Sequence, residues 1–155
     1  MEITNRLDVF EPGDQTALIS IDVPEAQRLV VEQLSALGYK LHTGLFTEDI
    51  LLKVRTHIYD VVLISEHFNG TDLETNPILA EAARFSPQQR RKQVVVIIGS
   101  SLNTDDESEA FQHSVDLVVN LSDIVNLRPV LRRAVLRKQE FYTPFHETMK
   151  TVGAA

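Results

Sequence analysis

The sequence contains no cysteine and no tryptophan, and aromatic residues make up only 6% of its 155 residues. Without cysteine the chain can form no disulfide bond, no thiolate metal site and no thiol nucleophile. Its longest purely aliphatic run, residues 94–98, is far shorter than the roughly 20 residues that a membrane-spanning helix needs, so we expect no membrane segment. The first residues lack the basic segment and following apolar segment that mark export, so we expect a cytoplasmic protein.

Positive charge is also scarce. Lysine and arginine total 15 against 22 aspartate and glutamate residues, which gives a formal net charge of −7. Non-specific nucleic-acid binding depends on cationic contacts to phosphate, so this balance disfavours nucleic acid as a partner. Hydrophobic residues still make up 43% of the chain, which is ordinary for a soluble domain, and the length suits a single one. Residues 1–15 are polar and contain a turn signal, so we interpret them as an N-terminal tail or linker.

Short apolar runs alternate with amphipathic segments along the rest of the chain. The amphipathic segments carry apolar residues at three- and four-residue steps, which is typical of helices with one buried face. This alternation predicts an α/β fold, a three-layer αβα sandwich with a doubly wound, five-stranded parallel sheet. The runs that we predict as strands span residues 16–21, 39–46, 60–65, 94–98 and 116–121.

Prolines, a glycine and an asparagine predict where the first and last helices begin and end. Pro24 suits the first position of a helix, and Gly38 suits a helix end. Asn126 is a good N-cap for the last helix, and we expect Pro144 to end it. Residues 141–155 would then form a C-terminal extension whose aromatic side chains fold back over the core.

Three segments, together with the order and lengths of the elements, suggest a family. The third predicted strand reads Asp60-Val-Val-Leu-Ile, an Asn69-Gly70 turn follows it, and the last predicted strand spans 116–121. With these features, residues 16–140 resemble a receiver domain of the CheY-like response regulators. The resemblance implies a flavodoxin-like topology and a role in two-component signal transduction.

The resemblance places Ser65 where family members carry the phospho-accepting aspartate, and Asn120 where they carry a lysine that pairs with the phosphoryl group. An acyl phosphate needs a carboxylate nucleophile, whereas Ser65 offers a hydroxyl with no adjacent base. Asn120 cannot compensate phosphoryl charge as a lysine does. We therefore expect a pseudo-receiver that accepts no phosphoryl group and has no catalytic residue.

The magnesium site that the resemblance implies is also incomplete. Its two adjacent acids correspond to Ile21 and Asp22, so only one acid remains. Because Mg²⁺ prefers a shell of hard oxygens that usually includes carboxylates, Asp22 alone is a poor anchor, and we expect no metal and no cofactor. The small hydroxyl residue at the end of the fourth strand corresponds to Gly99 or, with a shift of one residue, to Ser100.

Two alternatives stay open. Glu66 follows Ser65 and could supply a carboxylate if the strand bulges, although strand alternation turns it away from the site in the simple register. An atypical phosphorylatable receiver would use Glu66 or Asp22. The other alternative is a small-ligand-binding domain that uses the crevice at the carboxyl ends of the strands, where open α/β sheets bind ligands.

Acidic and basic side chains gather on the last two predicted helices, which flank the fifth strand. Receiver domains often dimerise through this face, and acids of one subunit meeting bases of the other would make it self-complementary under twofold symmetry. Exposed ion pairs contribute only about 0–1 kcal/mol each, so two solvated helix faces are the alternative. We thus predict a non-catalytic signalling or protein-interaction module that docks on a protein partner or forms a homodimer. The candidate interface residues are Asp105, Asp106, Glu109, Arg128, Arg132, Arg133 and Arg137.

Overall fold

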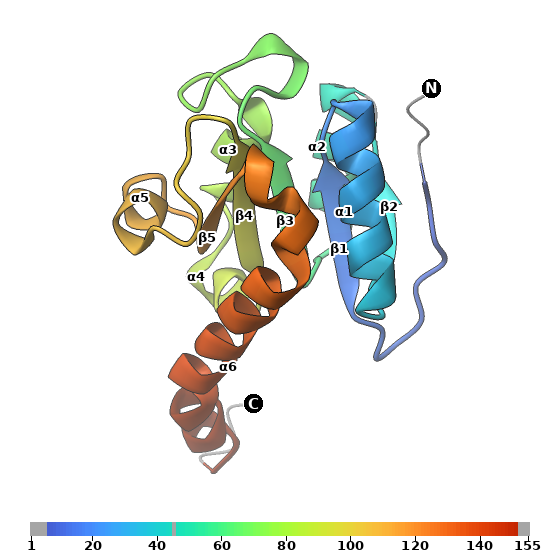
Figure 1. The fold of residues 1–155 in the computed structure, drawn as a ribbon. Coiled ribbons are helices and arrows are strands. Elements are labelled where there is room, and N and C mark those ends of the chain that lie inside the picture. The colour runs from blue at the N-terminus through green and yellow to red at the C-terminus, as the bar shows by residue number, and fades with distance from the viewer. Residues whose placement is uncertain (1–5, 45, 152–155) are drawn as a thin grey trace.

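A five-stranded parallel sheet forms the centre of the structure, a computed structural model that describes residues 6–44 and 46–151. The strand order is β2-β1-β3-β4-β5 (Figure 1). This order is that of a doubly wound, flavodoxin-like sheet, so the predicted fold class is confirmed. The strands are β1 (Thr16–Ser20), β2 (Lys40–Thr43), β3 (Val61–Ser65), β4 (Val94–Gly99) and β5 (Leu117–Asn120).

Helices cover both faces of the sheet. The strands alternate their side chains between the faces, so that Ala17 and Ile19 pack against α1 and α6 whereas Leu18 packs with α2, α3 and α5. Because both faces are buried, the strands read as continuous apolar runs. The helices are α1 (Pro24–Ala36), α2 (Thr47–Thr56), α3 (Pro77–Ala82), α4 (Pro87–Arg90), α5 (Glu107–Gln112) and α6 (Leu127–Thr151), with 3₁₀ turns η1 (Phe68–Gly70) and η2 (Leu121–Asn126).

The ends of the first helix agree with the sequence signals. Pro24 is the first residue of α1, and Gly38 follows the helix with a φ of +94°. This left-handed conformation favours glycine because a side chain would clash with the following carbonyl. None of the helices within residues 6–44 and 46–151 is both long and apolar enough to cross a bilayer.

The last helix differs from its prediction at both ends. Asn126 does not cap it, because η2 runs directly into α6, and Asn120 instead caps η2 by accepting a hydrogen bond from Ser122 N–H at 2.9 Å. The expectation that Pro144 ends the helix is wrong, since α6 continues to Thr151 and projects past the amino ends of the strands (Figure 1). A proline removes one backbone donor, but hydrogen bonds on either side can carry a kinked helix past it. The extension therefore does not fold back as expected. Residues 1–5 of the predicted tail and 152–155 of the predicted extension lie outside the described residues.

Short irregular segments cover both edge strands. Residues 6–8 lie along β2 and form backbone hydrogen bonds of 2.8 and 3.1 Å with Thr43 and Leu41. At the other edge, Asp105 N–H donates to Val118 O of β5 at 2.9 Å. Open strand edges attract other strands, and these backbone hydrogen bonds occupy part of both edges.

Candidate functional site

A hollow of about 180 Å³ lies at the carboxyl ends of β1, β3 and β4. These strands are neighbours in the sheet, so the residues that follow them meet at one edge although they are far apart in the sequence. Glu66 and His67 line the hollow, and Asn120 ends β5 beside it. The other predicted site residues around the hollow are Ile21, Asp22, Ser65, Gly99 and Ser100.

Asp22 joins two loops at this edge. Its Oδ2 accepts a hydrogen bond from Asn69 N–H at 2.7 Å. Asn69 has a φ of +54°, a conformation that asparagine tolerates better than most residues, and its Nδ2 donates to Thr47 Oγ1 at 3.0 Å. Asp22 therefore ties the end of β1 to the loop after β3 and, through Asn69, to the start of α2.

Ser65 ends β3 and is half-buried. Its carbonyl oxygen accepts a hydrogen bond from Asn76 Nδ2 at 2.9 Å, while Asn76 Oδ1 caps α3 by accepting from Ile78 N–H at 3.0 Å. The Ser65 hydroxyl has no hydrogen-bond partner within the described part of the chain. With no base bonded to it, this hydroxyl lacks the activation that a serine nucleophile needs.

Glu66 is the buried acid of the site, with 5% of its surface exposed. Its N–H extends the β3–β4 ladder by donating to Ile98 O at 2.8 Å. Its carboxylate accepts a hydrogen bond from the hydroxyl of Ser101 and a longer one, at 3.4 Å, from Ser101 N–H. The expectation that alternation turns Glu66 away from the site is wrong, because β3 ends at Ser65 and alternation holds only within a strand.

Gly99 is required by the position of Glu66. A Cβ at residue 99 would overlap the Glu66 side chain, which lies against the backbone at the end of β4. Ser101, which the sequence analysis did not single out, supplies the hydroxyl for Glu66, whereas Ser100 is exposed. The sequence does show a pair of serines after β4 that could have pointed to this contact. Which of the two faces inward depends on the geometry of the turn.

Asn120 is also held by neighbouring loops. Its Nδ2 donates to Leu102 O at 2.7 Å and to Ser100 O at 3.3 Å, and its Oδ1 accepts from Ser122 N–H. Both ends of the amide are therefore engaged in fixing the loops after β4 and β5.

The donors around the hollow do not fit magnesium. Its acids, Asp22 and Glu66, already accept hydrogen bonds from the protein, and Ile21 offers no ligand. The Glu66 carboxylate also has His67 beside it, with Nε2 at 3.6 Å from Oε1. Across residues 6–44 and 46–151, no three histidine or acidic side chains are arranged to hold a metal ion.

The acids of the candidate interface are paired within the chain. Asp105 accepts hydrogen bonds from Arg137 at 2.9 and 3.3 Å, which raises the pKa of the Arg137 guanidinium, and Arg133 lies 3.8 Å from the same carboxylate. Asp106 caps α5 by accepting from Glu109 N–H at 3.0 Å, and Glu109 accepts from a loop amide at 2.8 Å. These acids fix α5 and the loop before it against α6.

Basic and aromatic side chains remain exposed on the same two helices. Arg128 and Arg132 of α6 are exposed, as are Phe111 of α5 (87%) and Phe141 of α6 (76%). The Phe141 ring contacts Tyr142 edge to face, with centroids 4.9 Å apart. Phe111 was not predicted as an interface residue, because a short helix with one buried residue shows little amphipathic pattern.

Comparisons with known proteins place the fold. Neither protein-family models nor curated proteins match the sequence. Among solved structures, HP1043, an orphan response regulator of H. pylori, has a TM-score of 0.59 and 17% identity over 79% of this chain and 98% of its own. The chemotaxis response regulator CheY4 of Vibrio cholerae has a TM-score of 0.56 and 15% identity over 78% and 98%. The signal receiver domain of an HD domain-containing protein from Pseudomonas fluorescens Pf-5 has a TM-score of 0.58 and 17% identity over 88% and 97%. The chain therefore has the fold of a response-regulator receiver domain.

Proposed function

We propose that the chain is a receiver-like signalling module that binds proteins and does not accept a phosphoryl group. One observation carries the proposal: next to Ser65, which the resemblance places at the acceptor position, the carboxylate of Glu66 is buried against Gly99 and bonded to Ser101. In this proposal, hydrogen bonds within the protein hold the side chains at the place where an active receiver would accept a phosphoryl group. The module would be non-enzymatic, would need no cofactor and would act in the cytoplasm.

The groups that phosphoryl transfer would need are engaged in structural contacts instead. Asp22 holds Asn69, and Asn120 holds the loops after β4 and β5. A phosphoryl group at Ser65 would find no lysine to neutralise it and a buried carboxylate beside it, which would repel it. The structural neighbours, which are response regulators and a signal receiver domain, support a role in signalling.

In this proposal the partner binds to the face formed by α5, by α6 and by the segment around Asp105, which bonds to β5. The internal pairs of Asp105 keep this face rigid, which lowers the entropy lost on binding. The exposed rings of Phe111 and Phe141 are suitable anchors, and Arg133 and Arg137, which lie at Asp105, supply charge on the same face. A second copy of the chain is the partner that this face would bind in a homodimer.

Incubation with acetyl phosphate and magnesium tests the first part of the proposal. Intact-mass spectrometry of the full chain is expected to show no added phosphoryl group, while a receiver domain with its aspartate intact gains one under the same conditions. A phosphoryl adduct that is lost in Glu66→Gln or Asp22→Asn would overturn the proposal in favour of an atypical active receiver.

Sedimentation velocity over a range of concentrations tests the surface. We expect a monomer–dimer equilibrium that the double variant Phe111→Ala, Phe141→Ala shifts toward monomer, as does Arg132→Glu with Arg133→Glu. Phe46→Ala is the matched control, because Phe46 is 68% exposed but lies at the start of α2, away from this face. A chain that stays monomeric at high concentration, or a dimer that only the control weakens, would refute the homodimer.

A further inference from the structure

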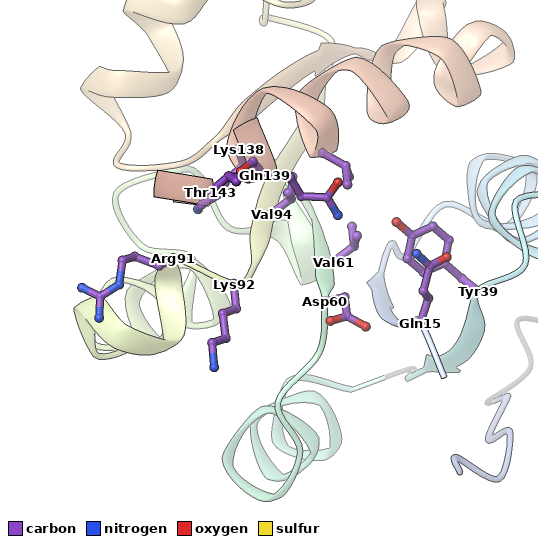
Figure 2. Close-up of a pocket in the computed structure, with 11 residues that line it drawn as sticks. Gln15, Tyr39, Asp60, Val61, Arg91, Lys92, Val94, Lys138, Gln139 and Thr143 are labelled. Carbon is purple, nitrogen blue, oxygen red and sulfur yellow. Dashed lines mark hydrogen bonds between the residues drawn. The ribbon is translucent and has the colours of Figure 1, made fainter. Parts of the chain in front are cut away.

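A larger cavity, of about 460 Å³, lies at the opposite edge of the sheet. The projecting part of α6 overhangs the amino ends of the strands and closes the cavity from one side (Figure 2). The floor comes from apolar side chains at the starts of β3 and β4 and from Val135 of α6. Polar residues just before the strands surround this floor. Gln15, Tyr39 and Asp60 directly precede β1, β2 and β3, Lys92 lies two residues before β4, and α6 adds Lys138, Gln139 and Thr143.

One buried polar group at this cavity has no partner among the described residues. The Tyr39 side chain is almost buried, at 9% exposed, yet its hydroxyl forms no hydrogen bond with any residue of the described chain. The side chains of Gln15 and Gln139 also line the cavity but are exposed, so water can satisfy their amides. Polar groups of protein interiors are nearly always hydrogen-bonded, so a hydroxyl that borders a cavity without a partner indicates a site for a polar ligand or for water.

The charged groups divide the cavity into two ends. On the α6 side, Lys138 Nζ donates to Asp116 Oδ1 at 2.8 Å, and Arg90 lies 3.7 Å from the other oxygen of that carboxylate, so one acid faces two cations. Arg91 and Lys92 also line the cavity, but Figure 2 shows their side chains directed away from Lys138. The Lys138 ammonium group has three N–H donors. One of them donates to Asp116, so the others can donate to an anion.

The other end offers hydrogen-bond acceptors. Asp60 Oδ2 accepts from Thr16 N–H at 2.8 Å and from the Thr16 hydroxyl at 3.4 Å, while its second oxygen has no partner among the described residues. Burial, with a contribution from the charge of Asp60, raises the pKa of the Tyr39 hydroxyl, so it stays protonated and able to donate. Figure 2 shows Tyr39, Gln15 and Asp60 together on this side of the cavity.

We propose that this cavity binds a small organic anion that also carries hydroxyl or amino groups, with the anion at Lys138 and the donor groups at Asp60 and Tyr39. A volume of about 460 Å³ falls within the range of small-molecule sites, roughly 300–1,000 Å³. An adjoining hollow of about 220 Å³ between α1 and α6 shares Tyr39 and Val135 and is lined further by Leu37, Leu131 and Leu136, which suits an apolar body. The site does not depend on the proposed function, because it lies at the other edge of the sheet.

Open α/β sheets usually bind ligands at the carboxyl edge, at the point where the strand order reverses. In this chain Glu66 and Ser101 occupy that edge. The amino edge becomes concave only because α6 continues beyond it, so the length of α6 accounts for the unusual location.

Methyl NMR of the full-length chain tests this site, with Val61, Val94 and Val135 as reporters. The probes are adenosine monophosphate, glucose 6-phosphate and phenylalanine, each of which joins an anion to hydroxyl or amino donors. Adenosine, glucose and phenylethylamine are the matched compounds without the anion. We expect at least one probe to shift the three valines saturably, and its matched neutral or cationic compound to bind about tenfold more weakly or worse.

Variants then locate the site. Tyr39→Phe and Lys138→Met are each expected to weaken binding about tenfold, and Val135→Phe, which fills the cavity, to abolish it. Ser65→Ala, at the carboxyl edge, should leave the affinity unchanged. The proposal is overturned if no probe gives a saturable shift at millimolar concentration, or if binding persists unchanged in both Tyr39→Phe and Val135→Phe while their NMR spectra show folded protein.

Discussion

The polar side chains at the two edges of the sheet differ in whether the protein hydrogen-bonds them. At the carboxyl edge, Asp22, Glu66 and Asn120 all hydrogen-bond to the protein around a hollow of about 180 Å³. At the amino edge, the hydroxyl of the buried Tyr39 has no such partner among the described residues and borders a cavity of about 460 Å³. Most sheets of this kind bind ligands at the carboxyl edge, but here the polar groups of that edge are bonded to the protein. At the amino edge, which usually contributes to stability, a polar group is available to a ligand.

This contrast separates stability from binding. A satisfied buried polar group contributes to stability, whereas an unsatisfied one costs free energy that only a ligand or water can offset. We therefore expect substitutions at the carboxyl edge to lower the free energy of unfolding, and comparable polar deletions at the amino edge to leave it nearly unchanged.

The largest effect is expected from Gly99→Ala. The φ of Gly99 lies outside the left-handed region, so alanine is acceptable to the backbone, but its Cβ would overlap the Glu66 side chain. Displacing this buried carboxylate should lower the free energy of unfolding by about 2–3 kcal/mol, measured by urea denaturation. In the background Glu66→Ala the same substitution should cost much less, because the overlapping atoms are gone. Equal costs in both backgrounds would show that Glu66 does not close this edge.

Ser101→Ala is expected to have the next largest effect. The variant removes the hydroxyl donor of a buried carboxylate and leaves only the backbone N–H at 3.4 Å. We expect a loss of about 1–2 kcal/mol in urea denaturation, since a buried charge without its partner retains its desolvation cost. The neighbouring exposed Ser100→Ala is the matched control and should change stability by less than about 0.5 kcal/mol. The assignment of Ser101 fails if the two alanine variants behave alike.

The sequence predicts the sheet well because the strand pattern is local. Continuous apolar runs identify the strands, and their order in the chain determines that Asp22 and Ser65 meet at one edge. The orientation of Glu66 depends on whether β3 ends at Ser65 or one residue later. The apolar pattern of the sequence does not locate a strand end to within one residue. The amino-edge cavity could not be predicted, because its lining residues come from five separate segments of the chain and no local pattern shows that α6 overhangs this edge.

A third, smaller effect should appear as a pH dependence at the β2 edge, where a fully bonded group can titrate. His42 is buried, its Nε2–H donates to Asp8 O at 2.9 Å, and its Nδ1 accepts from the Tyr59 hydroxyl at 2.7 Å. Burial lowers the pKa of His42, and the nearby His57 and Lys53 lower it further.

The unfolded chain therefore binds a proton at a pH where the folded chain does not. The free energy of unfolding should fall as the pH drops below about 6.5, the ordinary histidine pKa, and should level off below the folded pKa. Urea midpoints at pH 7.5, 6.5 and 5.5 measure this slope. His42→Gln, which keeps a donor and an acceptor but does not titrate, should flatten it, and an unchanged slope would assign the dependence to the other histidines.

The smallest effect on stability is expected from Tyr39→Phe, and this variant tests the contrast most directly. Its hydroxyl has no partner among the described residues, so its removal should change the free energy of unfolding by no more than about 0.5 kcal/mol. Tyr59→Phe is the matched control, because the Tyr59 ring is also buried but its hydroxyl bonds His42; it should cost about 1 kcal/mol or more. Equal losses in the two variants would mean that the Tyr39 hydroxyl already has a partner. The amino edge would then be closed like the carboxyl edge, and the unpartnered groups on which the ligand site rests would not exist.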